Sequence, residues 1–593
     1  MKKKNVVFCL SLMILLAGAP MFAQGHLAVE LGHPVYAIID TAEMRGVVAR
    51  LSSVKPYTSR QTAELLAAMM GRMEAFSPAE QAMIQRWFDA FRAGTGVEDS
   101  ALKDATTGGK VGIRFESTAR LGVGGLIDLL DGSGTEAFKD LWAVNSRFVP
   151  YLAGDPVSWL SLKGEAGFTF DKIEYNSADL TKGLYLPYEF TKEWDATHIW
   201  FGEPRNSDGD LDYPTASYDI RQDIAAETDS GSLMVRFSRF RRDWGVGSGS
   251  FSLSGTARPF VGAEVQFKPS KYFAVTSLIG SLSNWQKGEQ EKSTSSTAIS
   301  WQKMLGLQRM ELFPFDWLTI SATSTLVGAK RLELGYMAPL LFSVMYQNQL
   351  ADIDNLGVQI DGKAVLPGIA TVYGSFFTDE MEITNLSELF TKARNMFALQ
   401  GGLKARVPGL PFGMLTAQYT KIEPFVYSHY PTWYPDYRLK VDTSYTQDGE
   451  NLGYYLPPNS DEFLLRLDAM PADGWRIGLR YAFVRHGDNP QADWNAGLPR
   501  IYGDPLKYMD YGKLMQYNKD FLHDGIYDYN HIGRIEVAWR PAAPQVLGLS
   551  VPFELSAAFG LSYTWWEDGL GLGRAVNAPV WKQVLSVSCR LFM

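Results

Sequence analysis

The segment from Arg241 to Phe260 has the composition of a loop that closely approaches a ligand or another part of the protein. It contains four glycines, Gly245, Gly247, Gly249 and Gly255, and the absence of a Cβ lets a backbone come unusually near other atoms. A phosphate-binding loop would need a lysine after the last glycine and a helix behind it. A catalytic serine elbow would need Gly-x-Ser-x-Gly, a spacing that Ser248 and Ser250 do not have. We therefore expect a crowded loop or bulge between strands rather than a catalytic site.

Metal chemistry has little support in the sequence. Asp208, Asp210 and Asp212 have the spacing of the first ligands of a calcium loop, with Asp219 at position 12. Tyr213 stands where that loop needs glycine, so a solvated acidic loop is the preferred interpretation and calcium the alternative. The seven histidines are scattered and form no His-Glu-x-x-His motif. The sequence predicts no metal, no cofactor and no enzymatic activity.

The richest aromatic block, Phe425 to Tyr437, contains Tyr430, Trp433 and Tyr434 together with Pro431 and Pro435, and Pro424 stands directly before it. The prolines predict a loop. Aromatic rings with polar groups suit the faces of sugars, and they also suit a membrane interface or a loop packed on itself. Two interpretations stay open, a glycan-binding platform and a structural loop.

The first part of the chain predicts export and then helices. Residues 1–23 carry three lysines, an apolar run from Val6 to Leu16 and small residues up to Ala23, which is the layout of a signal peptide cleaved near Ala23. For residues 24–108 we expect a small α-helical region in the periplasm. Capping-box spacings predict helix starts there, at Asp40 with Glu43, Thr58 with Gln61 and Ser77 with Glu80.

From about Lys110 the apolar pattern changes to a period of two, which predicts strands with one dry and one wet face. Several runs reach roughly ten residues, the length of a tilted membrane-crossing strand, and some end in an aromatic residue such as Trp539 or Trp565. We expect residues 109–593 to form a large antiparallel transmembrane β-barrel of about 18 strands with long loops. The fold class is mainly β, and the predicted location is the outer membrane, with its lipid as a partner.

Strand parity also predicts which charges face the lumen. The predicted inward bases are Arg114, Arg120, Lys163, Arg236, Lys404, Arg406, Arg466, Arg476, Arg480, Arg534 and Arg590. They outnumber the predicted inward acids, Glu116, Glu165, Glu264, Asp468 and Glu536. The lumen is then basic, unless these arginines pair with acids across strands and only stiffen the barrel.

The overall charge and the last strand restrict the partners. With 56 Lys and Arg against 65 Asp and Glu, the formal net charge is −9, so nucleic acid is not an expected partner. Cys589 is the one cysteine outside the predicted signal peptide, which excludes an intrachain disulfide. The alternation from Leu585 to Phe592 resembles the terminal strand signal read by the barrel-assembly machinery.

The segment from Asp243 to Phe260 resembles the signature of the Wzi family of capsule-assembly outer-membrane proteins. The matching residues are Trp244, Gly245, Gly247, Ser254, Ala257, Arg258, Pro259 and Phe260. Similar patterns follow in order at 310–315, 357–361, 373–379, 451–453 and 459–461, and an earlier one lies at 56–60.

The resemblance implies an eighteen-stranded barrel that binds surface polysaccharide and takes part in capsule or exopolysaccharide assembly, without enzymatic activity. Four arginines before the signature, Arg236, Arg239, Arg241 and Arg242, are candidates for contacts with acidic sugars. The remaining glycan candidates are Trp244, Tyr430, Trp433 and Tyr434. The alternative function is a general porin or nutrient channel with a basic lumen.

Overall fold

Eighteen strands close an antiparallel β-barrel within the part of the chain that the computed structural model describes, as the sequence predicts. The described residues are 25–92, 110–126, 141–175, 198–201, 211–283, 299–331, 333–337, 345–347, 354–381, 386–434, 439–488, 518–519, 521–522, 526–541, 545–546, 549–550, 552–568 and 579–592. Around the wall, the first nine strands are β2 (Lys110–Leu126), β3 (Leu141–Val157), β4 (Leu160–Tyr175), β6 (Leu211–Glu227), β7 (Leu233–Phe240), β9 (Phe260–Ser270), β10 (Phe273–Leu282), β12 (Lys303–Phe315) and β13 (Leu318–Ala329). The other nine are β14 (Asn355–Leu366), β15 (Ala370–Glu380), β16 (Met396–Arg406), β17 (Met414–Ile422), β22 (Ser460–Ala469), β23 (Trp475–Asp488), β24 (Ile526–Trp539), β27 (Phe553–Asp568) and β28 (Val580–Phe592).

The last strand closes the barrel. β28 pairs with β2 along thirteen residue positions, from Arg114 opposite Phe592 to Leu126 opposite Val580. The short strand β5 (His198–Phe201) pairs with β6 beside the main ladder. Because closure leaves no unpaired edge in the wall, the backbone groups of the strands are satisfied within the sheet.

The outer wall carries an apolar band between two aromatic groups. At the end of the wall where short turns join the strands, Trp475 stacks on Trp539 with ring centroids 5.9 Å apart. Towards the other end, Tyr529 stacks on Trp565 at 5.0 Å. Between them the outward side chains are exposed and apolar, as Leu479 is. This pattern is that of a barrel embedded in a bilayer, with aromatic girdles at both interfaces.

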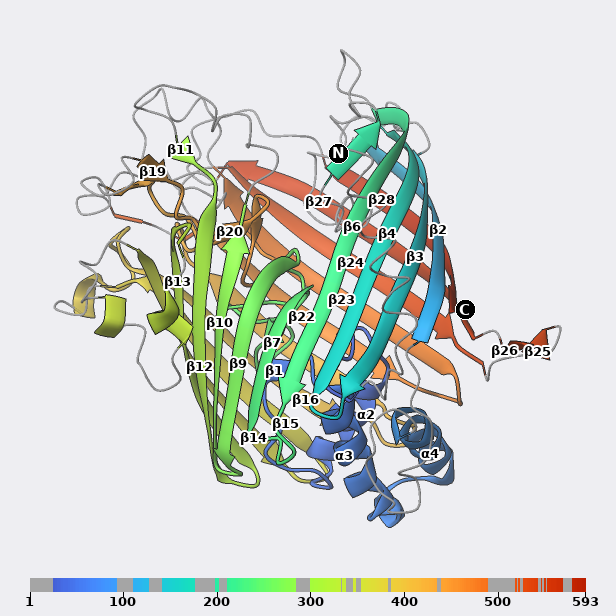
Figure 1. The fold of residues 1–593 in the computed structure, drawn as a ribbon. Coiled ribbons are helices and arrows are strands. Elements are labelled where there is room, and N and C mark those ends of the chain that lie inside the picture. The colour runs from blue at the N-terminus through green and yellow to red at the C-terminus, as the bar shows by residue number, and fades with distance from the viewer. Residues whose placement is uncertain are drawn as a thin grey trace, which may run out of the picture.

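The two ends of the barrel differ in their connections. Short turns, such as 158–159, 271–272 and 316–317, lie at one end, and long connections, such as 241–259 and 423–459, leave from the other. In barrels of this type the short turns are periplasmic and the long loops extracellular. Figure 1 shows the N-terminal helices, drawn in blue, gathered at one end of the barrel. They lie at the short-turn end, where the amide of Gly368 donates to the carbonyl of Met44.

Three helices build this region at the short-turn end: α2 (Val35–Met44), α3 (Ser59–Met70) and α4 (Pro78–Arg92), with a short 3-10 turn η1 (Met73–Ala75). Thr58 caps α3 in a complete capping box with Gln61, as predicted. The predicted helix start at Asp40 is wrong, because α2 already begins at Val35. Among the described residues, no helix is both long and apolar enough to span a bilayer.

Smaller elements lie in the connections. β1 (Val54–Lys55) pairs with β8 (Asp243–Trp244), which joins the N-terminal region to the predicted signature. β18 (Thr432–Tyr434), β19 (Leu439–Val441) and β11 (Ile299–Ser300) form a three-stranded sheet. The remaining short elements are β20 (Thr446–Gln447), β21 (Glu450–Asn451), β25 (Gln545–Val546), β26 (Leu549–Ser550), η3 (Leu334–Met337) and η4 (Leu386–Glu388).

Candidate functional site

The signature segment lies inside the barrel. It leaves the wall where β7 ends at Phe240 and returns where β9 begins, and between these points it reaches the lumen side of β14 and β17. There the amide of Ser252 donates to Gln359 Oε1 at 2.7 Å, and the amide of Ser248 donates to Gln418 Oε1 at 2.9 Å. The sequence predicted a crowded loop between strands, and the structure confirms this and places the loop in the lumen.

The glycines of the segment serve close packing. A Cβ at Gly247 would lie 2.2 Å from Gln400 Oε1, and one at Gly245 would lie 2.7 Å from Ser250 Cβ. Gly249 has a φ of 92°, in the left-handed region that favours glycine. The close approach predicted from composition is therefore made to the barrel's own side chains.

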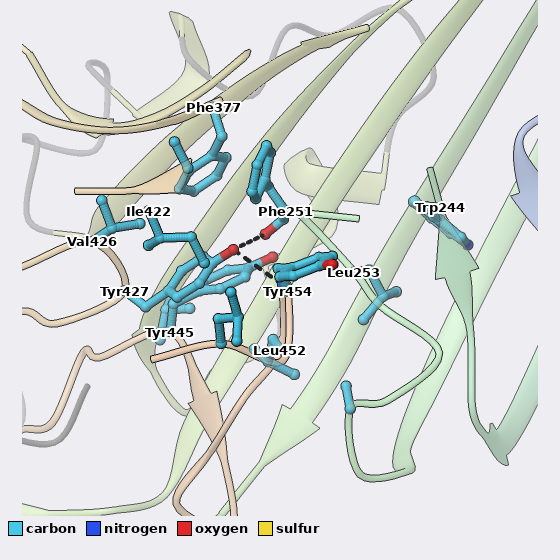
Figure 2. Close-up of a cluster of buried hydrophobic side chains, with 14 of the residues drawn as sticks. Trp244, Phe251, Leu253, Phe377, Ile422, Val426, Tyr427, Tyr445, Leu452 and Tyr454 are labelled. Carbon is cyan, nitrogen blue, oxygen red and sulfur yellow. Dashed lines mark hydrogen bonds between the residues drawn. The ribbon is translucent and has the colours of Figure 1, made fainter. Parts of the chain in front are cut away.

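A second inward connection, 423–459, meets this segment in the lumen. Figure 2 shows Phe251 beside Tyr427 and Tyr454, with the Tyr427 hydroxyl at the centre of two hydrogen bonds. That hydroxyl donates to the carbonyl of Phe251 at 3.1 Å and accepts from the amide of Tyr454 at 3.1 Å. All three rings are buried, as is Trp244, in one apolar cluster with Leu452. The lumen at this level is filled with packed side chains.

The other signature residues join the two inward segments. Arg258 forms an ion pair with Glu450 at 3.1 Å, and the amide of Ser254 donates to the carbonyl of Leu452 at 2.9 Å. Ser254, Ala257, Pro259 and Phe260 are buried. The contacts of Arg258 and Ser254 join the signature segment to the 450–452 part of the second connection.

The arginines predicted to bind acidic sugars make internal contacts. Arg236 pairs with Asp223 at 3.1 Å and Arg242 with Glu264 at 3.1 Å, and both arginines are buried. Arg239 pairs with Asp219, and Arg241 donates to the carbonyl of Gly255 at 3.3 Å. These contacts give the four arginines a structural role. Among the glycan candidates, the exposed Trp433 is therefore better placed to contact a ligand.

Residues near the N-terminus extend across the short-turn mouth of the barrel from wall to wall. His26 Nδ1 lies 2.8 Å from Glu227 Oε2 on one side, and the carbonyl of Gly32 accepts from Arg476 at 3.4 Å on another. Further along, Glu43 in α2 pairs with Lys363 of β14 at 2.6 Å. The N-terminal region is thus fixed to several strands around the mouth.

Among the shifted pKa values of this region, those of Glu80 and His33 bear on the packing of the helices. Burial would raise the pKa of Glu80, but hydrogen bonds from Arg45 and from the amides of Phe412 and Ser77 lower it to about 2. Burial, with Arg540 nearby, lowers the pKa of His33 to about 3. Glu80 therefore stays ionised and His33 neutral at neutral pH, and the packing of the helices depends on both states.

The aromatic block of the sequence divides over two faces of one strand. Tyr434 is buried, and its hydroxyl donates to Asp354 Oδ1 at 3.0 Å, a carboxylate also bound by Arg331 at 2.9 Å. Trp433, its neighbour in β18, is 46% exposed. Successive side chains of a strand point to opposite faces, so Tyr434 anchors the strand and Trp433 faces outward.

Lys440 stands beside Trp433 on the exposed face. The two residues are direct partners in the antiparallel pairing of β18 with β19, and Lys440 is also exposed. The sheet is fixed from below, since Asp442, directly after β19, binds Lys303 Nζ at 2.7 Å. Figure 1 places β11 and β19 at the end of the barrel opposite the helices. We call the pair of Trp433 and Lys440 the extracellular platform.

Tyr430 lies closer to the lumen than the platform does. It packs against the buried cluster around Phe251, and its carbonyl accepts from the Thr443 hydroxyl at 3.2 Å. Lys440 was not singled out from the sequence. No signal in the sequence shows that it pairs with Trp433, because this depends on the register of two three-residue strands.

On the inward face of the wall, three arginines stand side by side. Arg466 is opposite Arg480 in the pairing of β22 with β23, and Arg480 is opposite Arg534 in the pairing of β23 with β24. Their side chains are 50%, 37% and 30% exposed. Each pairs with an acid on its own or the neighbouring strand: Asp468, Glu462 and Glu536, respectively. Both interpretations from the sequence hold in part, since the arginines face the lumen and are paired there.

The calcium candidate lies mostly outside the described residues, which exclude Asp208 and Asp210. Asp212 belongs to β6, a strand of the wall, and Asp219 of the same strand is bound by arginines. The expected acidic loop is therefore wrong from residue 211 onward, because the alternation of β6 continues through it. Within the described ranges, no cluster of His, Cys, Asp or Glu is placed to hold a metal ion.

Comparisons with known proteins give low similarity. No family model matches the chain, and no curated protein sequence matches it. Among solved structures, the chain is similar to Wzi of Escherichia coli, an outer membrane protein involved in group 1 capsule assembly and described as a carbohydrate-binding β-barrel (TM-score 0.49, 13% identity, 96% of this chain and 99% of that chain). It is also similar to OccK7 (OpdD) of Pseudomonas aeruginosa (TM-score 0.39, 11% identity, 82% and 100%) and to OprD of the same organism (0.37, 12%, 81% and 95%).

Proposed function

We propose that this protein is an outer-membrane barrel that binds surface polysaccharide on its extracellular side and helps to attach it to the cell, without enzymatic activity. One observation carries the proposal: an exposed tryptophan, Trp433, stands beside an exposed lysine, Lys440, on an anchored sheet. An aromatic face stacks on the apolar face of a sugar ring, and an ammonium group attracts its carboxylate or phosphate. The pair suits an acidic polysaccharide.

The filled lumen supports binding rather than transport. The two inward segments meet in the buried cluster around Phe251, and the N-terminal region is fixed across the periplasmic mouth. The likeness of residues 243–260 to the Wzi signature supports membership of that capsule-assembly family. In this proposal, residues 1–23 are removed on export, and the barrel-assembly machinery inserts the chain through its C-terminal strand.

A channel for anionic solutes is the second candidate. The observation that favours it is the row of Arg466, Arg480 and Arg534, whose exposed guanidinium groups face the lumen. Although each is paired with an acid, their partly exposed guanidinium groups add positive potential to the lumen, which attracts anions. In planar bilayers, this candidate predicts a steady conductance whose anion selectivity falls in the variant Arg480→Ser.

The proposed function is tested in cells that lack the protein and are complemented with variants. We expect Trp433→Ala to move polysaccharide from the cell surface into the medium, because the stacking face is lost. Trp317→Ala is the matched control, since Trp317 is 47% exposed but lies in a turn at the periplasmic end. Equal retention of polysaccharide by both variants at equal protein levels would contradict the proposal.

A further inference from the structure

The outer wall of the barrel contains an apolar groove of about 350 Å³ on strands β17, β22, β23, β24 and β27. This volume lies within the roughly 300–1,000 Å³ of ligand sites. Its walls include Leu479, Ile535 and Phe559, which are 39%, 51% and 41% exposed on the outward face. The groove therefore opens towards lipid and not into the lumen.

The groove exists because a side chain is missing from the wall. Gly533 stands in one row between Tyr481 of β23 and Leu561 of β27. A Cβ at this glycine would meet no atom within 4 Å. The large neighbours on both sides form the walls, and the bare backbone of Gly533 forms the floor.

A polar group lies directly above the groove. His531, two residues before Gly533 on the same face of β24, is exposed on the outward wall. Its Nδ1 lies 2.9 Å from the Tyr481 hydroxyl, and its ring lies 4.8 Å from Phe483 and 5.4 Å from Trp565. A neutral imidazole that accepts this hydrogen bond at Nδ1 carries its proton on Nε2, as a donor.

The position of this group in the membrane identifies what it faces. The aromatic residues around His531 belong to the girdle on the extracellular side, at the level of lipid headgroups. One row further out, Arg485 pairs with Asp461 and is 38% exposed. A hydrogen-bond donor and a guanidinium group at this level suit a phosphate, and the apolar groove below suits a hydrocarbon chain.

We propose that this groove is a specific lipid site. It holds one acyl chain of a phosphate-bearing lipid of the extracellular leaflet, with the phosphate at His531 and Arg485. Since lipid chains are as apolar as the wall, close packing in the groove and the polar contacts of the headgroup provide the preference over bulk lipid. The site does not depend on polysaccharide binding at Trp433.

The test measures lipid bound to the purified, delipidated full-length protein in detergent by native mass spectrometry, with bisphosphorylated lipid A as the probe. We expect one retained lipid per wild-type barrel. Gly533→Leu fills the groove, and occupancy falls on the order of tenfold, the factor lost with roughly ten close carbon contacts. Ala119→Leu is the control, because Ala119 is exposed on the outward face of β2, outside the groove.

A second variant tests the headgroup contact without filling the groove. His531→Phe keeps the aromatic packing, and we expect it to bind phosphorylated and dephosphorylated lipid A equally, whereas the wild type prefers the phosphorylated form. Heat-modifiable mobility in gels verifies that each barrel is folded. The proposal is overturned if the wild type retains no lipid, or if Gly533→Leu retains as much as Ala119→Leu.

Discussion

The variant Gly453→Ala tests whether the two inward segments hold each other in the lumen. The added methyl group would lie 2.0 Å from the carbonyl oxygen of Phe251 and 2.4 Å from the hydroxyl of Tyr427. The hydrogen bond between these two groups, and the one from Tyr454 to the same hydroxyl, would then break. Each bond contributes about 1 kcal/mol, and overpacking a core costs about 1–3 kcal/mol. We expect the packing of the two segments to lose about 3–5 kcal/mol in total.

Hydrogen exchange measures this loss where it occurs. We expect exchange in residues 241–259 and 423–459 to accelerate by roughly two to four orders of magnitude, while the wall strands keep their protection. Gly401→Ala is the control, because a Cβ at Gly401 in β16 meets no atom within 4 Å. Wild-type exchange rates in Gly453→Ala, or an equal acceleration throughout the wall, would refute the coupling of these two segments.

Two further predictions concern a buried ion pair between wall strands and a histidine of the N-terminal region. Arg309→Ala leaves the buried carboxylate of Asp361, now 2.6 Å from Arg309, without its ion-pair partner. We expect a loss of about 3–5 kcal/mol in urea unfolding. A change below about 1 kcal/mol, typical of surface pairs, would contradict this. In the unfolded state, His33 binds a proton near its ordinary pKa of 6.5, but in the folded state its pKa is about 3. The helices are therefore fully stable above pH 6.5 and become progressively less stable as the pH falls from 6.5 to 3. Limited proteolysis of the helices should therefore begin at a lower pH in His33→Phe, and an identical onset in both proteins would refute the role of His33.

The wall of the barrel was predictable from the sequence, because burial against lipid imposes a period of two on each strand. The same parity placed Arg236 and Glu264 in the lumen correctly. The acidic spacing around Asp219 suggested a loop instead, although β6 begins at Leu211 and runs through Asp212 and Asp219. The partners of Arg239 were therefore missed, and the arginine was expected to be available to a ligand.

The interior and the platform were only partly predictable. The glycines around Trp244 indicated a close approach of the backbone, but its partners, such as Gln359, lie more than a hundred residues away in the chain. The prolines indicated a loop around Trp433. They gave no sign of the short strand β18, which puts Trp433 on an exposed face and Tyr434 on the buried one. Such assignments depend on strand pairing and loop folding, which local patterns do not contain.

Equilibrium binding of the purified barrel to the acidic surface polysaccharide of its own cells tests the central claim most directly. We predict saturable binding by the wild type and by Trp317→Ala. We expect a loss on the order of tenfold in Trp433→Ala, since stacking contributes about 0.5–1.5 kcal/mol beyond the buried area of the ring. Binding should also weaken with salt, because Lys440 acts at the exposed surface. Absence of binding by the wild type, or equal affinity of the wild type and Trp433→Ala, would contradict the account.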